Sequence, residues 1–336
     1  HRERGHFLPR QDAGVAAAGL GRGPGVSPLT HQNLRGTWAP VLLPLAPDEA
    51  IDFGLLHEEL TVLLGAGLDG IYTNGTASEF HCLEEDEYDR ITDVVAQACQ
   101  KAGVPCQLGA SQMSGQASLR RIRVAAAYDP AAIQVILPDW CPLSADEVLS
   151  TIDRMARQSG EVPLVLYNPP HAKTRLTPTL FGCLAAEFPQ LIGVKVAGGD
   201  AAWFEQMRDL AADLAIFVAG HRLASGLRQG ASGSYSNVAC MTPRGAVSWY
   251  QAMRTDPVAA QESEIRLNAF LATHVFPLQA AHYGNAALDK ALAAAGGWAP
   301  IGTRLRWPSR SVPGPAVDAL RQAARDELPE FFPAAP

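Results

Sequence analysis

The segment Leu191-Ile192-Gly193-Val194-Lys195-Val196-Ala197-Gly198-Gly199-Asp200 contains a complete junction between a strand and a helix. Its first four residues form a short apolar run that is typical of a strand, and Lys195 closes this run. Glycines follow this run, and the helical stretch 201–211 comes next. Because the same order of strand, turn and helix recurs along the chain from Arg35 onward, this unit decides the fold class.

Eight strand-like runs alternate with helical stretches. The predicted strands are residues 37–43, 68–73, 105–110, 132–137, 163–167, 191–195, 214–218 and 232–235. The predicted helices are residues 52–66, 84–102, 114–127, 144–158, 178–187, 201–211, 222–229 and 243–253. Eight such units in series favour α/β architecture closed into a (β/α)8 TIM barrel. An open doubly wound sheet would more often carry a Gly-rich loop after its first strand, where this chain has Pro44-Leu45-Ala46-Pro47.

The chain divides into three predicted parts. Residues 1–34 are rich in Gly, Ala, Arg and Pro and lack periodicity, which predicts a flexible N-terminal extension, with an organellar transit peptide as the alternative. Residues 35–256 form the predicted catalytic barrel. Beyond Pro257 the helical stretches 258–273, 286–295 and 315–327 follow one another without strands. Residues 257–336 are therefore predicted to form a C-terminal helical domain.

Bulk properties exclude several classes of function. The chain has 27 basic and 34 acidic residues, a net charge of −7 and no basic stripe, which argues against a nucleic-acid partner. Its six cysteines are widely scattered without a CxxC pair, which fits a reducing environment, and we expect a cytoplasmic protein. No apolar run is long enough to span a membrane. The nine histidines form no HExxH or similar cluster, so no metal site is predicted.

Lys195 ends the sixth predicted strand. Most lysines after a strand are solvated loop residues. In a barrel, however, functional groups gather at the carboxyl ends of the strands, where apolar walls lower the pKa of a lysine and leave some free amine. Tyr167 ends the neighbouring fifth strand, with the two chains about 4.8 Å apart. An amine nucleophile and a phenol that shuttles protons would then meet at one reacting carbon.

The second predicted strand ends in Asn74-Gly75-Thr76-Ala77-Ser78-Glu79-Phe80. Its turn Gly75-Thr76-Ala77 offers backbone N–H groups and a hydroxyl, which suit a carboxylate. Glu79 is predicted to cap the next helix. Taken singly, the turn is ordinary βα turn chemistry and Tyr167 is a wall residue with a hydrogen-bonded hydroxyl. Their combination with Lys195 on the second, fifth and sixth strands predicts a catalytic site.

These segments resemble the dihydrodipicolinate synthase / N-acetylneuraminate lyase family of class I, Schiff-base aldolases. The matching segments, in family order and spacing, are residues 40–45, 70–79, 167–170, 193–195 and 230–237. The resemblance implies that Lys195 forms an imine with a 2-oxo acid, usually pyruvate, and that Tyr167 is the proton shuttle. It implies that Thr76 and the Thr76–Ala77 amides bind the carboxylate of that acid. It also implies a homotetramer, a dimer of dimers, with no metal or organic cofactor.

Three positions depart from the family pattern and indicate an atypical subgroup. Ala77 replaces the second of two adjacent hydroxyl residues in the carboxylate turn. Trp140 replaces a tyrosine that the dihydrodipicolinate synthases contribute to a proton relay across the dimer, and an indole N–H only donates. Ala172 stands where those enzymes carry an arginine for the carboxylate of the aldehyde substrate, with Lys173 and Arg175 nearby. The lysine-biosynthesis activity is therefore not expected.

The ends of the seventh and eighth strands also differ from the sialic acid lyases. Those enzymes present acidic residues after the glycine of the seventh strand, whereas Gly220 is followed here by His221-Arg222, a basic loop that suits an acidic second substrate. Ser232 replaces a usual aliphatic residue of the oxo-acid pocket, and Ser234 follows in the same run. We expect the substrate to be bound by Gly75, Ala77, Trp140, Gly220, His221, Ser232 and Ser234, with His171 at the rim.

These features predict a Schiff-base lyase. The enzyme would condense pyruvate or a related 2-oxo acid with an aldehyde, or cleave such a bond by the retro-aldol reaction. A dehydratase of an acidic sugar, which uses the same imine to acidify the neighbouring C–H, is the nearest alternative. A non-catalytic paralogue with a binding or regulatory role is the alternative from another class. The missing hydroxyl and tyrosine relay motivate it, and the presence of both Lys195 and Tyr167 argues against it.

Overall fold

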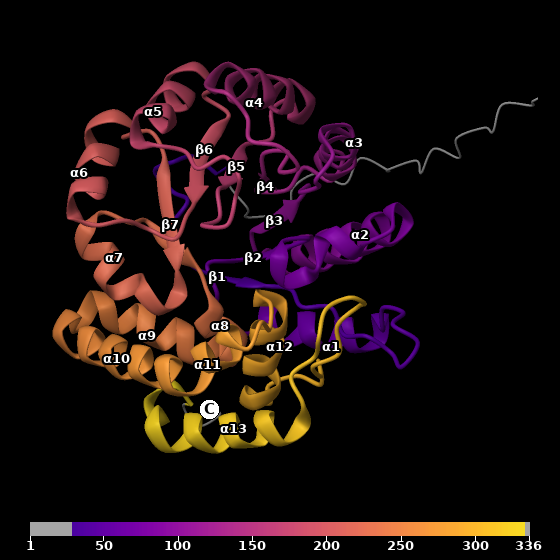
Figure 1. The fold of residues 1–336 in the computed structure, drawn as a ribbon, viewed down its shortest axis with the longest axis vertical. Coiled ribbons are helices and arrows are strands. Elements are labelled where there is room, and N and C mark those ends of the chain that lie inside the picture. Colours follow the sequence, from indigo (N-terminus) through magenta and orange to yellow (C-terminus); the bar gives the residue numbers. More distant parts are fainter. Residues whose placement is uncertain (1–28, 333–336) are drawn as a thin grey trace, which may run out of the picture.

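A computed structural model describes residues 29–332, which form a closed barrel of eight parallel strands inside a ring of helices (Figure 1). The strands are paired in chain order, and β8 pairs with β1 to close the sheet. They are β1 (Gly36–Pro40), β2 (Gly70–Thr73), β3 (Cys106–Gly109), β4 (Ala132–Val135), β5 (Leu164–Tyr167), β6 (Leu191–Lys195), β7 (Ala215–Ala219) and β8 (Gly233–Tyr235). The predicted TIM barrel is confirmed. Most of the predicted N-terminal extension, residues 1–28, lies outside the described residues.

Most helices of the ring begin at side chains that satisfy their first N–H groups. Ser144 accepts from the N–H of Glu147, whose carboxylate accepts from the N–H of Ser144 in return. Asp200, at the end of the β6 junction, caps its helix by accepting from Trp203 N. The ring contains α1 (Phe53–Leu64), α2 (Glu85–Ala102), α3 (Gly115–Ala126), α4 (Ala145–Ser159), α5 (Pro178–Glu187), α6 (Ala201–Leu210), α7 (Leu223–Gln229), α8 (Asn237–Met241) and α9 (Pro243–Thr255).

Side chains alternate along the strands between two apolar cores. Outward residues such as Leu166 and Val194 pack against the ring of helices. Inward residues, among them Tyr72, Phe217 and Tyr235, fill the barrel. The barrel is therefore a packed core rather than a channel, and a ligand can bind only at its ends.

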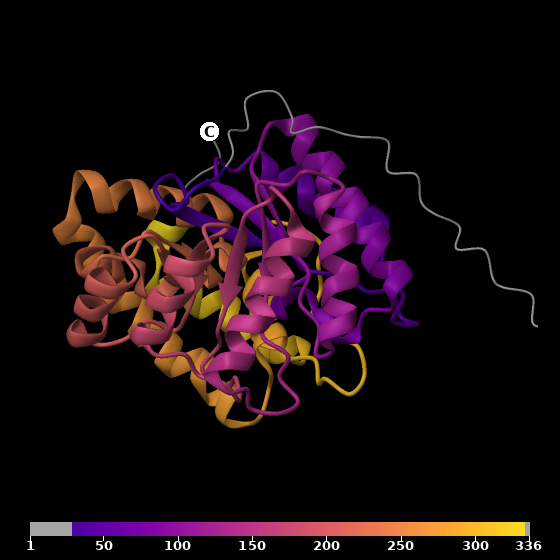
Figure 2. The same ribbon diagram turned by 90° about the horizontal axis from the view of Figure 1, so that it is seen from above.

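Helices continue after the barrel, as the sequence predicts. They are α10 (Pro257–Phe270), the π-helical turn η4 (Leu271–Val275), α11 (Phe276–Ala280), α12 (Asn285–Gly296) and α13 (Gly314–Glu327). Helix α12 packs against α8, α13 and the 3₁₀ turn η1 (Thr76–Ser78) after β2. Figures 1 and 2 show these orange and yellow helices lying against the ring near α8 and α9. The division into domains at residue 256 stays a prediction. None of the helices in the described part of the chain is long and apolar enough to cross a bilayer.

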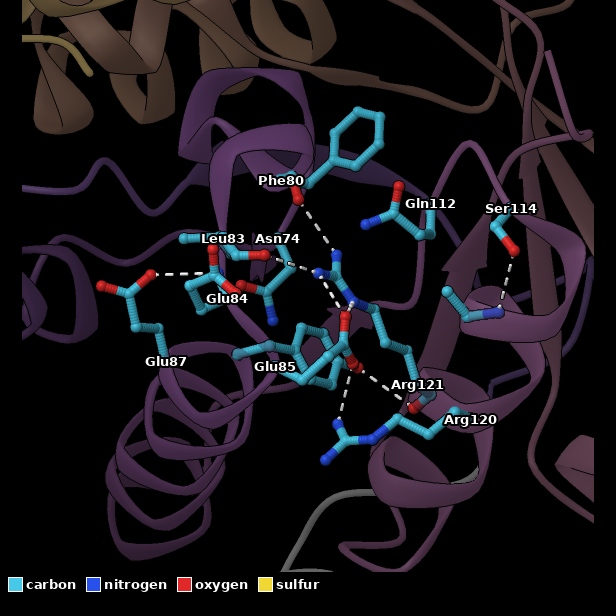
Figure 3. Close-up of polar contacts among 12 residues, drawn as sticks. Asn74, Phe80, Leu83, Glu84, Glu85, Glu87, Gln112, Ser114, Arg120 and Arg121 are labelled. Atoms are coloured by element: carbon cyan, nitrogen blue, oxygen red, sulfur yellow. Dashed lines mark hydrogen bonds and ion pairs between the residues drawn. The ribbon is translucent and has the colours of Figure 1, made fainter. Parts of the chain in front are cut away.

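Buried Arg121 of α3 holds the loop between β2 and α2 (Figure 3). Its guanidinium donates to the carbonyl oxygens of Phe80, Leu83 and Ser111 at 3.0, 3.2 and 3.0 Å. It also pairs with the carboxylate of Glu85, its Nε 2.9 Å from Oε1. Because a guanidinium donates through several N–H groups in a rigid plane, one side chain fixes two carbonyls of this loop and ties them to Ser111, which follows β3. The turn after β2 is thereby held at the carboxyl end of the barrel.

We expect Arg121→Ala to lower the free energy of unfolding by about 3 kcal/mol, because three carbonyl acceptors lose their donor at roughly 1 kcal/mol each. Chemical denaturation measures the change. Arg120→Ala is the matched control, since the Arg120 side chain is 32% exposed and pairs with Asp89 and Glu85. This control should lose about 1 kcal/mol or less. Equal losses in the two variants would contradict the assigned role of the buried guanidinium.

Candidate active site

Tyr167 and Lys195 are the last residues of β5 and β6, and their Cα atoms are partners in the parallel ladder. The Lys195 Nζ lies 4.3 Å from the centre of the Tyr167 ring. It also lies 4.6 Å from the ring centre of Tyr72 and 5.0 Å from that of Tyr235, which come from β2 and β8. Three aromatic faces therefore surround the amine. The structure brings together the amine and the phenol that the sequence predicts at adjacent strand ends.

This environment changes the pKa of both groups. Burial lowers the pKa of Lys195 to about 8, and the carboxylate of Asp289 acts in the opposite direction. At that pKa about a tenth of the lysine is free amine at neutral pH. Burial raises the pKa of Tyr167 to about 12, partly offset by a hydrogen bond with the Thr76 side chain. The phenol therefore stays protonated and can donate a proton beside a nucleophilic amine.

A cavity of about 370 Å³ opens above Lys195. The barrel contributes Tyr72, Thr76, Ala77, Tyr167, Lys195, Ala219, His221, Tyr235, Asn237 and Cys240 to its lining. The helices that follow the barrel contribute Leu271, Val275, Phe276, Gln279, Asn285, Leu288, Asp289 and Leu292. The cavity is thus shared between the carboxyl end of the barrel and the helices that follow it. Within residues 29–332, no three His, Cys, Asp or Glu side chains are arranged to hold a metal ion.

The turn after β2 lies as predicted at the edge of this cavity. Thr76 and Ala77 belong to η1 and contribute to the lining. Gly75 precedes them and does not line the cavity, but an added Cβ there would lie 3.3 Å from Nε2 of Gln134. The absence of a side chain at Gly75 therefore allows the turn to pack closely against Gln134. The turn lines the cavity through Thr76 and Ala77 instead.

Glu79 does not cap α2, which corrects that prediction. The residue adopts a left-handed conformation with φ 49° and begins a second 3₁₀ turn, Phe80–Cys82, so the helix starts only at residue 85. Glu84 and Glu87 form the capping box of α2 instead.

The Glu79 carboxylate pairs with Lys290 of α12, its Oε2 3.0 Å from the Lys290 Nζ. Both side chains are buried. Oε1 of Glu79 accepts from the backbone N–H of Arg306 at 3.0 Å, and the Lys290 Nζ also donates to the carbonyl of Arg304. The pair therefore joins η1 to α12 at the edge of the cavity.

Asp289 is a cavity residue that the sequence analysis missed. Burial raises the pKa of its carboxyl to about 6, while the positive charge of Lys195 and a hydrogen bond with Cys240 act in the opposite direction. The helix that carries Asp289 contacts the barrel through residues that are distant in the sequence. The local sequence pattern therefore could not predict that Asp289 lies in the cavity. A signal was present: Asp289 and Lys290 are the only charged residues in the Ala- and Leu-rich stretch 285–296.

The eighth strand places its side chains differently from the prediction. Ser232 precedes β8 and lies at the amino end of the barrel. Tyr235 points inward, and its hydroxyl donates to Oε1 of Gln107 at 2.6 Å. Because side chains alternate along a strand, Ser234 points out toward the helices. Neither serine lines the cavity, and the inward position at the carboxyl end of β8 belongs to Tyr235.

The seventh strand contributes one of its predicted residues. His221 lines the cavity beside Asn237, and burial lowers the pKa of its imidazole, which favours the neutral form. Gly220 is buried against α8, where an added Cβ would meet Oγ of Ser236 at 2.6 Å, and it does not line the cavity. Arg222 turns away from the cavity, into a separate small pocket beside α7. The predicted basic loop is therefore not presented to a substrate in this cavity.

Trp140 lies outside the cavity, which corrects its predicted place in the substrate site. It belongs to the loop after β4, and its side chain is exposed. The Lys173 Nζ donates to the Trp140 carbonyl at 2.6 Å and lies 4.9 Å from the centre of the indole ring. Lys173, which belongs to the loop between β5 and α5, is thereby held against the loop after β4. His171 lines a smaller neighbouring pocket on the far side of Thr76 and Tyr167.

Comparison with known proteins places this site in a family. The chain matches the model of the Dihydrodipicolinate synthetase family over residues 33–288. A 4-hydroxy-tetrahydrodipicolinate synthase from Methanothrix thermoacetophila is 26% identical over 258 residues, which cover 74% of this chain and 86% of that protein. An N-acetylneuraminate lyase from Escherichia coli is 27% identical over 208 residues, or 60% and 68% of the two chains. The fold of a sialic acid aldolase from Ruminococcus gnavus matches with a TM-score of 0.78 at 18% identity, covering 89% of this chain and 99% of that one.

We expect Asp289→Asn to stabilise the folded protein near neutral pH and to leave its stability at about pH 4 unchanged. The carboxyl pKa of about 6 in the folded state lies above the ordinary value of 3.8, so folding favours the protonated form. That contribution is complete below the ordinary pKa and is lost as the pH rises through 6. Two pKa units correspond to about 3 kcal/mol, and water in the cavity should reduce this to about 1–2 kcal/mol.

Thermal unfolding at several pH values measures this effect. Asp318→Asn, which removes an exposed carboxylate of α13, is the matched control and should show no such pH dependence. A change in melting temperature that is the same at acidic and neutral pH for Asp289→Asn would contradict the expectation.

Proposed function

Because the chain belongs to the Dihydrodipicolinate synthetase family and is a lyase of the class I aldolase type, we propose that Lys195 forms an imine with pyruvate or a related 2-oxo acid. The observation that carries this proposal is the lysine itself. Its Nζ lies 4.3 Å from the centre of the Tyr167 ring at the floor of a cavity. Its pKa of about 8 provides free amine at neutral pH.

Imine formation assigns a role to each neighbouring group. The amine of Lys195 attacks the ketone carbon, and the resulting carbinolamine loses water to give an iminium. The hydroxyl of Tyr167 donates a proton to the departing oxygen, since its pKa of about 12 keeps it protonated. The backbone N–H groups of Thr76 and Ala77, with the Thr76 hydroxyl, hold the carboxylate of the oxo acid. Loss of a proton from C3 converts the iminium into an enamine, whose electron pair forms a carbon–carbon bond to an aldehyde carbon. In the reverse direction that bond breaks and the iminium accepts its electron pair.

The rest of the cavity suits an uncharged aldehyde. Its polar lining beyond Lys195 and η1 includes the amides of Asn237, Gln279 and Asn285 and the imidazole of His221. No arginine lines the cavity in the part of the chain that the structure describes. Amides and a neutral imidazole hydrogen-bond hydroxyl groups without requiring a counter-charge. This lining supports an aldehyde partner without a further carboxylate.

The family resemblance also supports a homotetramer, arranged as a dimer of dimers. Exposed Trp140 and Trp307, with 79% and 81% of their surface accessible, offer apolar area for contacts between chains. The six free cysteines support a reducing compartment such as the cytoplasm.

We expect the protein to form a covalent adduct at Lys195 when it is incubated with pyruvate and sodium cyanoborohydride, because the reductant fixes the imine as a secondary amine. Mass spectrometry of the digested protein locates the adduct. Lys195→Ala should carry none, whereas Lys101→Ala, which removes an exposed lysine of α2, should be labelled like the wild type. The absence of an adduct in the wild type with pyruvate and with several longer 2-oxo acids would refute the proposed chemistry.

The rate of this trapping should depend on pH in a defined way. With a Lys195 pKa of about 8, the free amine, and with it the initial rate, should rise about tenfold between pH 6 and 7 and level off above about pH 8. Initial rates of adduct formation measured across this range test the expectation. A rate that still rises steeply as the pH approaches 10.5, the ordinary pKa of lysine, would show that the cavity does not lower the pKa of the amine.

A further inference from the structure

Asp289 lines the same cavity as Lys195 but has no part in imine formation as described above. The two side chains interact electrostatically, each opposing the effect of burial on the other. Among the described residues that line the cavity, Asp289 is the one carboxylate. A carboxylate on this wall costs folding free energy near neutral pH, so its presence calls for a role in the chemistry.

The position of a bound oxo acid indicates which atom Asp289 would meet. In the iminium of pyruvate, the carboxylate carbon and the methyl carbon C3 are attached on opposite sides of the carbon bonded to Nζ. The carboxylate side is occupied by η1, and Tyr167 is hydrogen-bonded to Thr76 on that side. Carbon C3 therefore points away from the carboxylate-binding groups of η1 and into the cavity, whose lining includes Asp289 beside Cys240 of α8.

We propose that Asp289 is the base that removes a proton from C3 of the Lys195 iminium and returns a proton to that carbon, a role that rests on the proposed imine. The C–H electron pair becomes the double bond between C2 and C3, and the π electrons of the C=N bond move to nitrogen. A neutral enamine and a carboxylic acid result. The reverse transfer restores the iminium, and no other reactant is needed.

The surroundings of Asp289 hold it in place for this role. Burial raises the pKa of Cys240 well above its ordinary value, so the thiol stays protonated and can donate to the carboxylate. Lys290, the next residue of α12, is fixed by its buried pair with Glu79. Asp289 is half-buried and lines the open cavity, so its proton can exchange with solvent between turnovers. Tyr167 is less suited to removing a proton, because its hydroxyl stays protonated at neutral pH.

Two measurements with pyruvate alone test the proposal without knowledge of the aldehyde. The first is cyanoborohydride trapping, which reports the imine. The second is exchange of the C3 hydrogens in D₂O, followed by proton NMR, which reports removal of the C3 proton. Lys195→Ala supplies the uncatalysed exchange rate. In Asp289→Asn we expect trapping at Lys195 to continue while the exchange rate falls by about 100-fold or more, the usual contribution of a general base.

Two further variants complete the design. Asp318→Asn, which removes an exposed carboxylate of α13, should match the wild type in both measurements. Asp289→Glu keeps a carboxylate on a longer side chain. This variant should exchange the C3 hydrogens of pyruvate faster than Asp289→Asn does, a difference that a purely structural role of Asp289 would not require. Undiminished exchange in Asp289→Asn would overturn the inference, as would a parallel loss of trapping and exchange. An imine absent from the wild type would instead overturn the proposed function.

Discussion

The ion pair between Glu79 and Lys290 is the contact on which the geometry of the site depends. Two fully buried charges are costly to desolvate, and they are tolerated only with good mutual geometry and further hydrogen bonds. Both conditions hold, because the pair also engages the backbone of Arg304 and Arg306. Since Glu79 follows the turn that carries Thr76 and Lys290 follows Asp289, one interaction positions both walls of the cavity. The C-terminal helices are therefore part of the site.

Position 77 carries alanine where the family turn carries a hydroxyl residue, and this difference fits the packing of α12 against the turn. The Ala77 methyl is buried in a small apolar cluster with Leu42, Ala293 and Ile301. The neighbours in this cluster offer a hydroxyl no hydrogen-bond partner, so a hydroxyl at position 77 could be satisfied only on the cavity side of the turn. Helix α12 supplies Ala293 to the cluster, so the departure from the family turn accompanies the way this helix is seated. In the proposed reaction, the carboxylate of the oxo acid would then be held by backbone N–H groups and by Thr76.

The sequence predicts those parts of the molecule that depend on the local hydrophobic pattern and on the order of strands and helices along the chain. Eight strands in series gave the barrel, and the rule that strands end at one rim placed Tyr167 beside Lys195. Prediction failed where a shift of one residue along a strand, or a single tertiary contact, determines whether a side chain faces the cavity. Ser234 and Tyr235 are neighbours in a three-residue strand, and only the pleat determines which of them faces the cavity. Asp289 was missed because nothing local indicates that its helix returns to the barrel mouth.

Helix α12 places two consecutive side chains in two different environments. Successive residues of an α-helix are rotated by about 100° about its axis, so Asp289 reaches the cavity while Lys290 reaches Glu79. A one-residue slip of the helix itself would take both charges away from their partners at once. Only one rotation of α12 about its axis therefore satisfies both contacts. The chemistry of the cavity and the stability of the fold depend on that same rotation.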